Sequence, residues 1–220
     1  MARELLKIRG ITDLPHSEPG MRIGLFGGSF NPPHQGHRMV SRQALKRLDL
    51  DAVWWLVTPG NPLKDFTELA PLKNRVLAAR QLVDHPRVKI TGFEASRGFR
   101  FTYDTLGFLR RTLPERKFVW IMGADSFVSF HLWEHWRRIA SLMPLAIYAR
   151  PGSSRLAPFS KAAIALARYR IKEKDATILP SMPAPAWVYL NGMMSSLSSK
   201  DIRKSQKFSI NPKKSGHTLV

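Results

Sequence analysis

The 220-residue sequence contains no cysteine, which excludes disulfide bonds and thiolate catalysis. Because disulfides are rare in a reducing compartment, this absence leads us to expect a cytoplasmic protein. The sequence also lacks any apolar run of the roughly 18 to 20 residues that a membrane-spanning helix needs. Residues 1–20 carry charges throughout and have no apolar block of the secretory type. We therefore expect no membrane partner.

Acidic residues are scarce: 16 Asp and Glu stand against 35 Lys and Arg, which gives a net charge of +19. Such a surface attracts nucleic acids, anionic membranes or phosphorylated small molecules. The basic residues are spread over many segments, as is typical of a solvated surface, and no known RNA- or DNA-binding signature accompanies them. We do not expect a nucleic-acid partner, although a basic nucleic-acid-binding protein without catalysis stays open as an alternative.

Short runs of β-branched and aromatic residues alternate with segments of helical periodicity. We expect strands at residues 22–26, 52–58, 87–91, 117–122, 145–149 and 187–190. We expect helices at residues 36–48, 71–83, 103–113, 131–141 and 158–170. Continuous apolar strands between amphipathic helices predict an α/β fold with a mostly parallel sheet covered on both faces.

The composition divides the chain into three parts. We expect a partly ordered N-terminal extension at residues 1–20, a single domain at 21–204, and a basic tail at 205–220. Within the domain, the stretch RPGSSR at residues 150–155 introduces a C-terminal subregion at 151–204.

Neither the GxxxxGK[ST] nor the GxGxxG phosphate loop is present, but GLFGGSFNPPHQGH spans residues 24–37. Gly27 and Gly28 follow the first expected strand, at the sheet edge where open α/β sheets bind ligands. Bare glycine backbone lets an anion approach the amide groups. His34 and His37 are three residues apart and would share one side of the next helix. This stretch predicts a phosphate site; a purely structural turn and a histidine metal site without an evident third ligand are the alternatives.

A second stretch, SSLSSKDIR, spans residues 195–203. Ser198 or Ser199 would cap a short helix, whose N-terminus offers amide groups and partial positive charge. Arg203 lies one turn after Ser199 and can reach an anion held there. Taken alone, this pattern is only a helix cap.

Together the two stretches resemble the nucleotidyltransferase superfamily, whose motifs are GxFxPxHxGH and SSTxIR. The first motif is matched at Gly28, Phe30, Pro32, His34, Gly36 and His37, and the second at Ser198, Ser199, Ile202 and Arg203. Lys200 stands where threonine is usual, which puts a specific role for that position in doubt. The resemblance implies a doubly wound Rossmann-like fold and nucleotidyl transfer from a nucleoside triphosphate. The implied ATP-binding residues are Gly27, Gly28, Ser29, Phe30, His34, Gly36, His37, Ser198, Ser199, Ile202 and Arg203, with His34, His37 and Arg203 as the catalytic residues.

Three inner stretches indicate the acceptor. GADSFVSFHLWEHW, residues 123–136, resembles the GxDxxxxFxxW segment of bacterial nicotinate-nucleotide adenylyltransferases. FTYDTL, residues 101–106, is similar to that family's YTxDTL, and PGNPLK, residues 59–64, falls where the family has a comparable loop. The resemblance implies adenylyl transfer from ATP to nicotinate mononucleotide, giving nicotinate adenine dinucleotide and pyrophosphate in NAD biosynthesis. Transfer to another phosphorylated acceptor, such as phosphopantetheine, is the alternative.

The implied mononucleotide site consists of Thr102, Gly123, Asp125, Trp133 and Lys64. Trp133 offers a flat face to the pyridine ring, Asp125 an acceptor to the ribose hydroxyls, and Thr102 a donor to the nicotinate carboxylate. The competing interpretation places Trp133 and Phe130 in the core, three residues apart on one helix. Lys64 and Arg75 are either phosphate contacts or solvated surface charges.

The implied cofactor is Mg²⁺, which the triphosphate itself would hold, so no protein metal site is expected. HLWEH at residues 131–135 formally matches the HxxEH pattern of some zinc peptidases, but no third ligand accompanies it. The preference for nicotinate over nicotinamide mononucleotide and the oligomeric state stay open, with a homodimer as one option.

Overall fold

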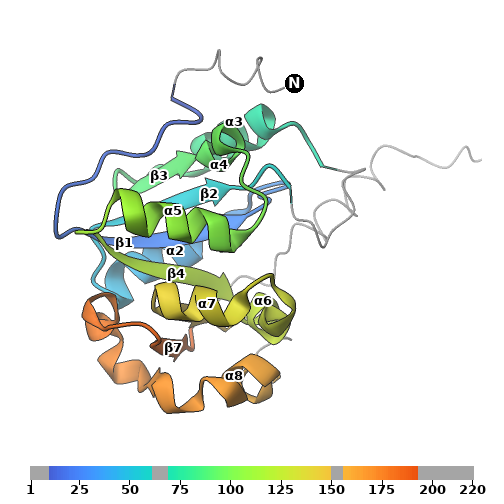
Figure 1. Ribbon diagram of the computed structural model, residues 1–220. Helices are drawn as coiled ribbons and strands as arrows, with labels where there is room; N and C mark the ends of the chain where they lie inside the picture. Colours follow the sequence, from blue (N-terminus) through green and yellow to red (C-terminus); the bar gives the residue numbers. More distant parts are fainter. Residues whose placement is uncertain (1–9, 61–68, 150–155, 193–220) are drawn as a thin grey trace, which may run out of the picture.

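The computed structural model describes residues 10–60, 69–149 and 156–192, and within them a single parallel sheet with the strand order β3-β2-β1-β4-β5-β7-β6 (Figure 1). The strands are β1 Arg22–Gly28, β2 Ala52–Val57, β3 Val88–Thr91, β4 Lys117–Gly123, β5 Leu145–Tyr148, β6 Arg170–Ile171 and β7 Trp187–Leu190. Every expected strand is confirmed to within two residues at its ends, and only the two-residue β6 was not expected. The predicted parallel α/β sheet is correct.

Strand β2 shows why the apolar runs predicted the sheet well. All six of its residues are buried, including the adjacent Trp54 and Trp55. Because side chains alternate along a strand, Trp54 and Trp55 enter the two separate apolar cores on opposite faces of the sheet. Both faces must therefore be covered by other elements.

The helices cover both faces. They are α2 Gln35–Arg47, α3 Leu72–Leu82, α4 Phe93–Arg97, α5 Thr102–Thr112, α6 Ala124–Val128, α7 Trp136–Leu142 and α8 Lys161–Ala165, with 3₁₀ turns η1 Phe130–Leu132, η2 Ala157–Phe159, η3 Ala167–Tyr169 and η4 Glu173–Ser181. Side chains of α5 to α8 pack in the core with Trp54, and those of α2 and α3 pack in the core with Trp55. In Figure 1, α5 and α7 lie in front of the strands and α2 behind them.

The single helix predicted at residues 131–141 is wrong. The chain makes η1, becomes extended at Trp133 (φ −75°, ψ 143°), takes a left-handed conformation at His135 (φ 54°), and only then begins α7. The buried Phe130 ring packs edge-on against Trp133, with centroids 5.4 Å apart, and against Trp136 at 5.8 Å. Residues 130 and 136 fall on different faces of a regular helix, so a bent chain is needed to bring both tryptophans to one ring.

The helix predicted at residues 158–170 is also wrong, because it divides into η2, α8 and η3. Ser160 interrupts it at one point, where its hydroxyl caps α8 by accepting a hydrogen bond from the Ala163 amide at 3.2 Å. Leu166 lies at the other interruption, where its carbonyl accepts the Trp187 indole N–H at 2.8 Å. The same carbonyl accepts the Tyr169 amide at 3.0 Å, so the chain continues there as the 3₁₀ turn η3.

Residues 10–20 are tied to the edge of the sheet. Ile11 is buried in the core, and its carbonyl accepts the Gly92 amide at 2.7 Å. The Thr91 hydroxyl donates to the Asp13 carbonyl at 2.7 Å. Within the described ranges, no helix has both the length and the apolarity required to cross a bilayer.

Candidate active site

The carboxyl end of β1 lies where the strand order changes direction, between β2 and β4. Ligands of open α/β sheets bind in the crevice at such a point. Gly27 and Gly28 are the last residues of β1, as the sequence predicts. A Cβ at Gly27 would lie 2.3 Å from Cη2 of Trp120, a distance that real Cβ atoms do not tolerate. Glycine is needed at position 27 because the indole of the neighbouring strand lies over it.

His34 and His37 form a close pair at the start of α2, with ring centroids 3.8 Å apart and ring planes tilted by 36°. Both rings are buried, and His34 is the N-cap of the helix. The Gly36 amide donates to Nδ1 of His34 at 3.1 Å, and the His34 amide donates to Nδ1 of His37 at 3.1 Å. Since each Nδ1 accepts a hydrogen bond, each neutral ring carries its proton on Nε2, which makes both Nε2 atoms donors.

Phe30 holds the turn between β1 and these histidines. Its ring is 1% exposed and stacks on Trp55 with centroids 4.6 Å apart. Its backbone has φ 46°, a conformation that favours glycine, and the aromatic packing compensates for that strain. Phe30 therefore belongs to the core and supports the turn from within.

A cavity of about 210 Å³ lies on the α5 and α7 face of the sheet, beside the end of β1. Its lining joins Thr102 and Trp133 to the three residues Gly27, Gly28 and Ser29. These residues come from the end of β1 and the loop after it, the start of α5 and the bent segment before α7. The structure thus brings together residues up to about a hundred positions apart that the motifs had selected independently.

The walls of the cavity suit a flat ring that carries an anion. Trp120, Trp133, Phe99 and Phe101 supply aromatic surface. Helix α5 begins at Thr102 without a side-chain cap, so its first amide groups lie at the cavity. The exposed Arg100 adds a cation, and sequence reasoning missed it although it directly precedes the FTYDTL stretch.

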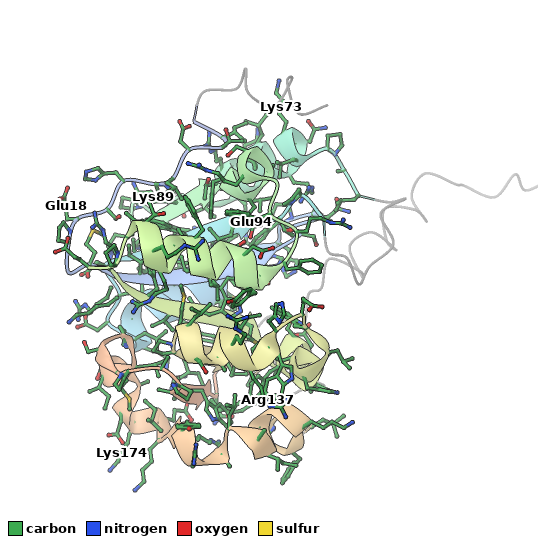
Figure 2. The ribbon with its side chains drawn as sticks, viewed as in Figure 1. Glu18, Lys73, Lys89, Glu94, Arg137 and Lys174 are labelled. Carbon is green, nitrogen blue, oxygen red and sulfur yellow. The ribbon has the colours of Figure 1, made fainter. Side chains whose placement is uncertain are left out.

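Glu94, in α4, is a second lining residue that sequence reasoning missed. Its side chain lies next to α5 (Figure 2) and accepts a hydrogen bond from the Thr105 hydroxyl at 2.6 Å. Burial raises the pKa of the Glu94 carboxyl from its ordinary value of 4.5 to about 7. The available signal was a lone acidic residue in the apolar stretch ITGFEA.

Comparison with known proteins shows to which family the chain belongs. The chain matches the cytidylyltransferase-like family over residues 25–205. It is 57% identical over 183 residues to a "Probable nicotinate-nucleotide adenylyltransferase" of Methylorubrum extorquens, with 83% of this chain and 99% of the relative covered. The chain belongs to the nicotinate-nucleotide adenylyltransferase family.

Other relatives agree with this family of nucleotidyltransferases. The Mesorhizobium japonicum "Probable nicotinate-nucleotide adenylyltransferase" is 50% identical over 194 residues, covering 88% of this chain and all of the relative. The fold is shared with the Plasmodium falciparum nicotinic acid mononucleotide adenylyltransferase complexed with APC, with a TM-score of 0.63, 16% identity, and 84% and 83% of the two chains covered. The same enzyme complexed with NaAD gives a TM-score of 0.62, 18% identity and coverage of 83% and 82%. The predicted Rossmann-like fold is confirmed.

Two residues that the adenylyltransferase resemblance assigns to the mononucleotide lie outside the cavity lining. Gly123 ends β4, and Asp125 is exposed on α6, whereas their neighbour Ser126 lines the cavity. The remaining family positions, namely Lys64, Ser198, Ser199, Ile202 and Arg203, lie outside the described residues.

Arg75 has neither of the two roles considered for it in this adenylyltransferase. It is 2% exposed, so it is not a solvated surface charge, and its guanidinium donates to backbone carbonyls. Leu72, Arg75, Val76 and Ala79 form the buried stripe of α3. An arginine at a core position of this helical pattern was the signal that sequence reasoning overlooked.

The histidines of HLWEH do not share a helix face. His131 lies in η1, with Nδ1 3.2 Å from the Val128 carbonyl oxygen. His135 precedes α7 and packs against Tyr103, with ring centroids 5.0 Å apart. The zinc-peptidase pattern requires both imidazoles on one helix, so this geometry does not fit it.

Proposed function

We propose that the protein transfers the adenylyl group of ATP to nicotinate mononucleotide, using the end of β1 and the adjacent cavity as its active site. One observation carries the assignment: Trp133, Thr102 and the glycine end of β1 line a single cavity. The family relationship supports the same reaction. The lining of the cavity and the family relationship therefore both support the proposed reaction.

In the proposed reaction, a phosphate oxygen of nicotinate mononucleotide attacks the α-phosphorus of ATP. The new phosphorus–oxygen bond joins the two mononucleotides, the bond from the α-phosphorus to the bridging oxygen breaks, and pyrophosphate leaves with that electron pair. The nucleophile is already an anion, so no side-chain base has to remove a proton. Catalysis would come from alignment and from donors aimed at the developing charge.

The histidine pair fits the role of those donors. Because the backbone donates to both Nδ1 atoms, the Nε2 protons of His34 and His37 are the ones that would face phosphate oxygens. Because the pair is held by the N-terminus of α2, the same place adds the partial positive charge of the helix. Ser198, Ser199, Ile202 and Arg203 remain proposed partners of the triphosphate from the second motif.

The acceptor nucleotide fits the cavity. A pyridine ring would stack on Trp133, and its carboxylate would meet the first amide groups of α5 at Thr102, with Arg100 near by. Gly123, Asp125 and Lys64 remain proposals for the ribose and phosphate. A carboxylate is favoured over an amide at this end because the helix N-terminus and Arg100 both supply positive charge.

Magnesium is the proposed metal. Within residues 10–60, 69–149 and 156–192, no three His, Asp or Glu side chains gather into a binding cluster. We propose that the triphosphate itself would hold Mg²⁺, which would offset phosphate charge, while the histidines and backbone amide groups of the site would supply hydrogen-bond donors.

The test combines substrate choice with a histidine variant. Purified protein with ATP and Mg²⁺ should release pyrophosphate with nicotinate mononucleotide, more slowly with nicotinamide mononucleotide, and not with phosphopantetheine. His37→Ala should lower kcat about a hundredfold, since one lost donor in such a site costs on the order of 3 kcal/mol. Gln35→Ala, an exposed change in the same helical turn, should leave turnover unaltered.

Two outcomes would contradict the proposal. A folded His37→Ala protein with near-normal turnover would remove the histidine from the mechanism. Absent turnover in the wild type, together with salt-dependent binding to RNA, would favour a basic nucleic-acid-binding protein.

A further inference from the structure

Arg75 is a buried cation in the first turn of α3. Its side chain is 2% exposed, and burial lowers the pKa of its guanidinium to about 10, so the group stays charged at neutral pH. Removing a cation from water is costly unless fixed polar groups replace its hydration. The polar groups that replace water around Arg75 therefore indicate which part of the structure the residue holds in place.

The groups that replace water are backbone carbonyls from three separate segments. Nε of Arg75 donates to the Ala70 carbonyl at 2.7 Å, and Nη1 donates to those of Ser29 at 2.7 Å and Thr58 at 2.8 Å. Nη2 donates to the Pro59 carbonyl at 3.4 Å. In the described part of the chain, no carboxylate forms an ion pair with this guanidinium, and the groups that offset its charge there are carbonyl dipoles.

Two of these carbonyls belong to the wall of the active-site cavity. Ser29 follows β1 and Thr58 follows β2, and both line the cavity. Their segments also contact each other, because the Thr58 amide donates to the Gly28 carbonyl at 3.0 Å. One planar guanidinium thus joins the ends of two adjacent strands at the place where the glycine backbone is exposed to a ligand.

The hydrogen bond from Arg75 to the Ser29 carbonyl also sets the direction of an amide group. In a planar trans peptide the carbonyl and the following N–H point in opposite directions. With the Ser29 carbonyl held by Arg75, the Phe30 N–H is directed away from α3. At the Thr58–Pro59 connection the proline has no N–H. There the guanidinium holds the backbone through the carbonyls of both residues.

We propose that Arg75 is a positioning residue for the adenylyl transfer: by holding the Ser29 and Thr58 carbonyls in one fork, it fixes the loop backbone that frames the triphosphate. It does so without contact with either substrate. This inference rests on the function proposed above. Arginine is required because its donors point in several fixed directions of one plane, whereas the lysine ammonium is a compact point charge.

The test uses Arg75→Lys and Arg75→Ala, with Arg80→Lys as the matched control. Arg80 lies on the same helix and donates to the Ile90 carbonyl at 3.3 Å, away from the cavity. Arg75→Lys should lower kcat about a hundredfold, because a displacement of about 1 Å at the reacting groups has an effect of this size. KM for both substrates should change little. Arg80→Lys should turn over like the wild type.

Chemical rescue separates positioning from bulk stability. Guanidinium ion at a sub-denaturing concentration should restore part of the turnover of Arg75→Ala, and methylammonium, which lacks the planar fork, should not. The variants are assayed well below their melting temperatures, with the folded fraction measured by circular dichroism.

Each other result overturns the proposal in a distinct way. Normal kcat in folded Arg75→Lys would show that the fork is dispensable, and a raised KM with unchanged kcat would indicate direct contact with substrate. Failure of Arg75→Lys to fold would give Arg75 a purely structural role. A wild-type protein that does not turn over ATP with nicotinate mononucleotide would instead refute the proposed function, so the two failures are distinguishable.

Discussion

Replacing Glu94 with glutamine should change how the stability of the protein depends on pH. The Glu94 side chain is 8% exposed and accepts a hydrogen bond from the fully buried Thr105 hydroxyl. Glutamine has nearly the same shape, keeps an oxygen for Thr105, and cannot ionise. The variant therefore isolates the cost of the charge from the cost of the packing.

The magnitude follows from the pKa of the carboxyl. Burial raises that pKa from 4.5 to about 7, a gap that corresponds to about 3 kcal/mol. Because the folded protein favours the neutral form, this contribution to the free energy of unfolding is complete below pH 4.5. It is lost as the pH rises through about 7, where the folded carboxyl ionises.

The assay is urea unfolding followed by tryptophan fluorescence, repeated from about pH 5 to about pH 8. Wild-type stability relative to Glu94→Gln should fall by up to about 3 kcal/mol across this range. Glu115→Gln provides the control, since the Glu115 side chain is 69% exposed and should follow the wild-type profile. Parallel pH profiles of the wild type and Glu94→Gln would refute the reasoning, because they would mean that burial does not disfavour the Glu94 charge.

Two further substitutions test the cavity wall. Gly27→Ala places a Cβ 2.3 Å from the Trp120 ring, so we expect a loss of about 1 to 3 kcal/mol in stability and a marked loss of turnover, measured by urea unfolding and pyrophosphate release. If this variant is as stable and active as the wild type, the indole is not packed over the end of β1. Trp133→Ala removes the proposed stacking surface and should raise KM for nicotinate mononucleotide at least about tenfold, with KM for ATP nearly unchanged in steady-state kinetics. An equal effect on both substrates would place Trp133 elsewhere than at the pyridine ring.

The sheet was predictable because its strands are apolar along their whole length, as in the AVWWLV of β2. The histidine pair was predictable for a similar reason: a spacing of three residues at a helix start fixes the geometry locally. The sequence pattern and the structure agree wherever the residues of a single strand or helix determine the geometry.

Prediction failed where distant groups decide the outcome. The chain bends at Trp133, where the Phe130 ring contacts two tryptophans, and α8 gives way to a 3₁₀ turn where the Leu166 carbonyl accepts the Trp187 indole N–H. Arg75 was misjudged for the same reason, since it is 46 residues from Ser29 and 17 from Thr58 along the chain. No spacing rule in one sequence reveals such partners.

The histidine pair and the cavity lie on opposite faces of the sheet and meet only at the end of β1. Under the proposed division of roles, selection for a new acceptor would reshape the segments after β3 and β4 and leave the histidine half unchanged. A protein engineer who wishes to retarget the transfer has the same freedom, and should begin at the bent chain around Trp133.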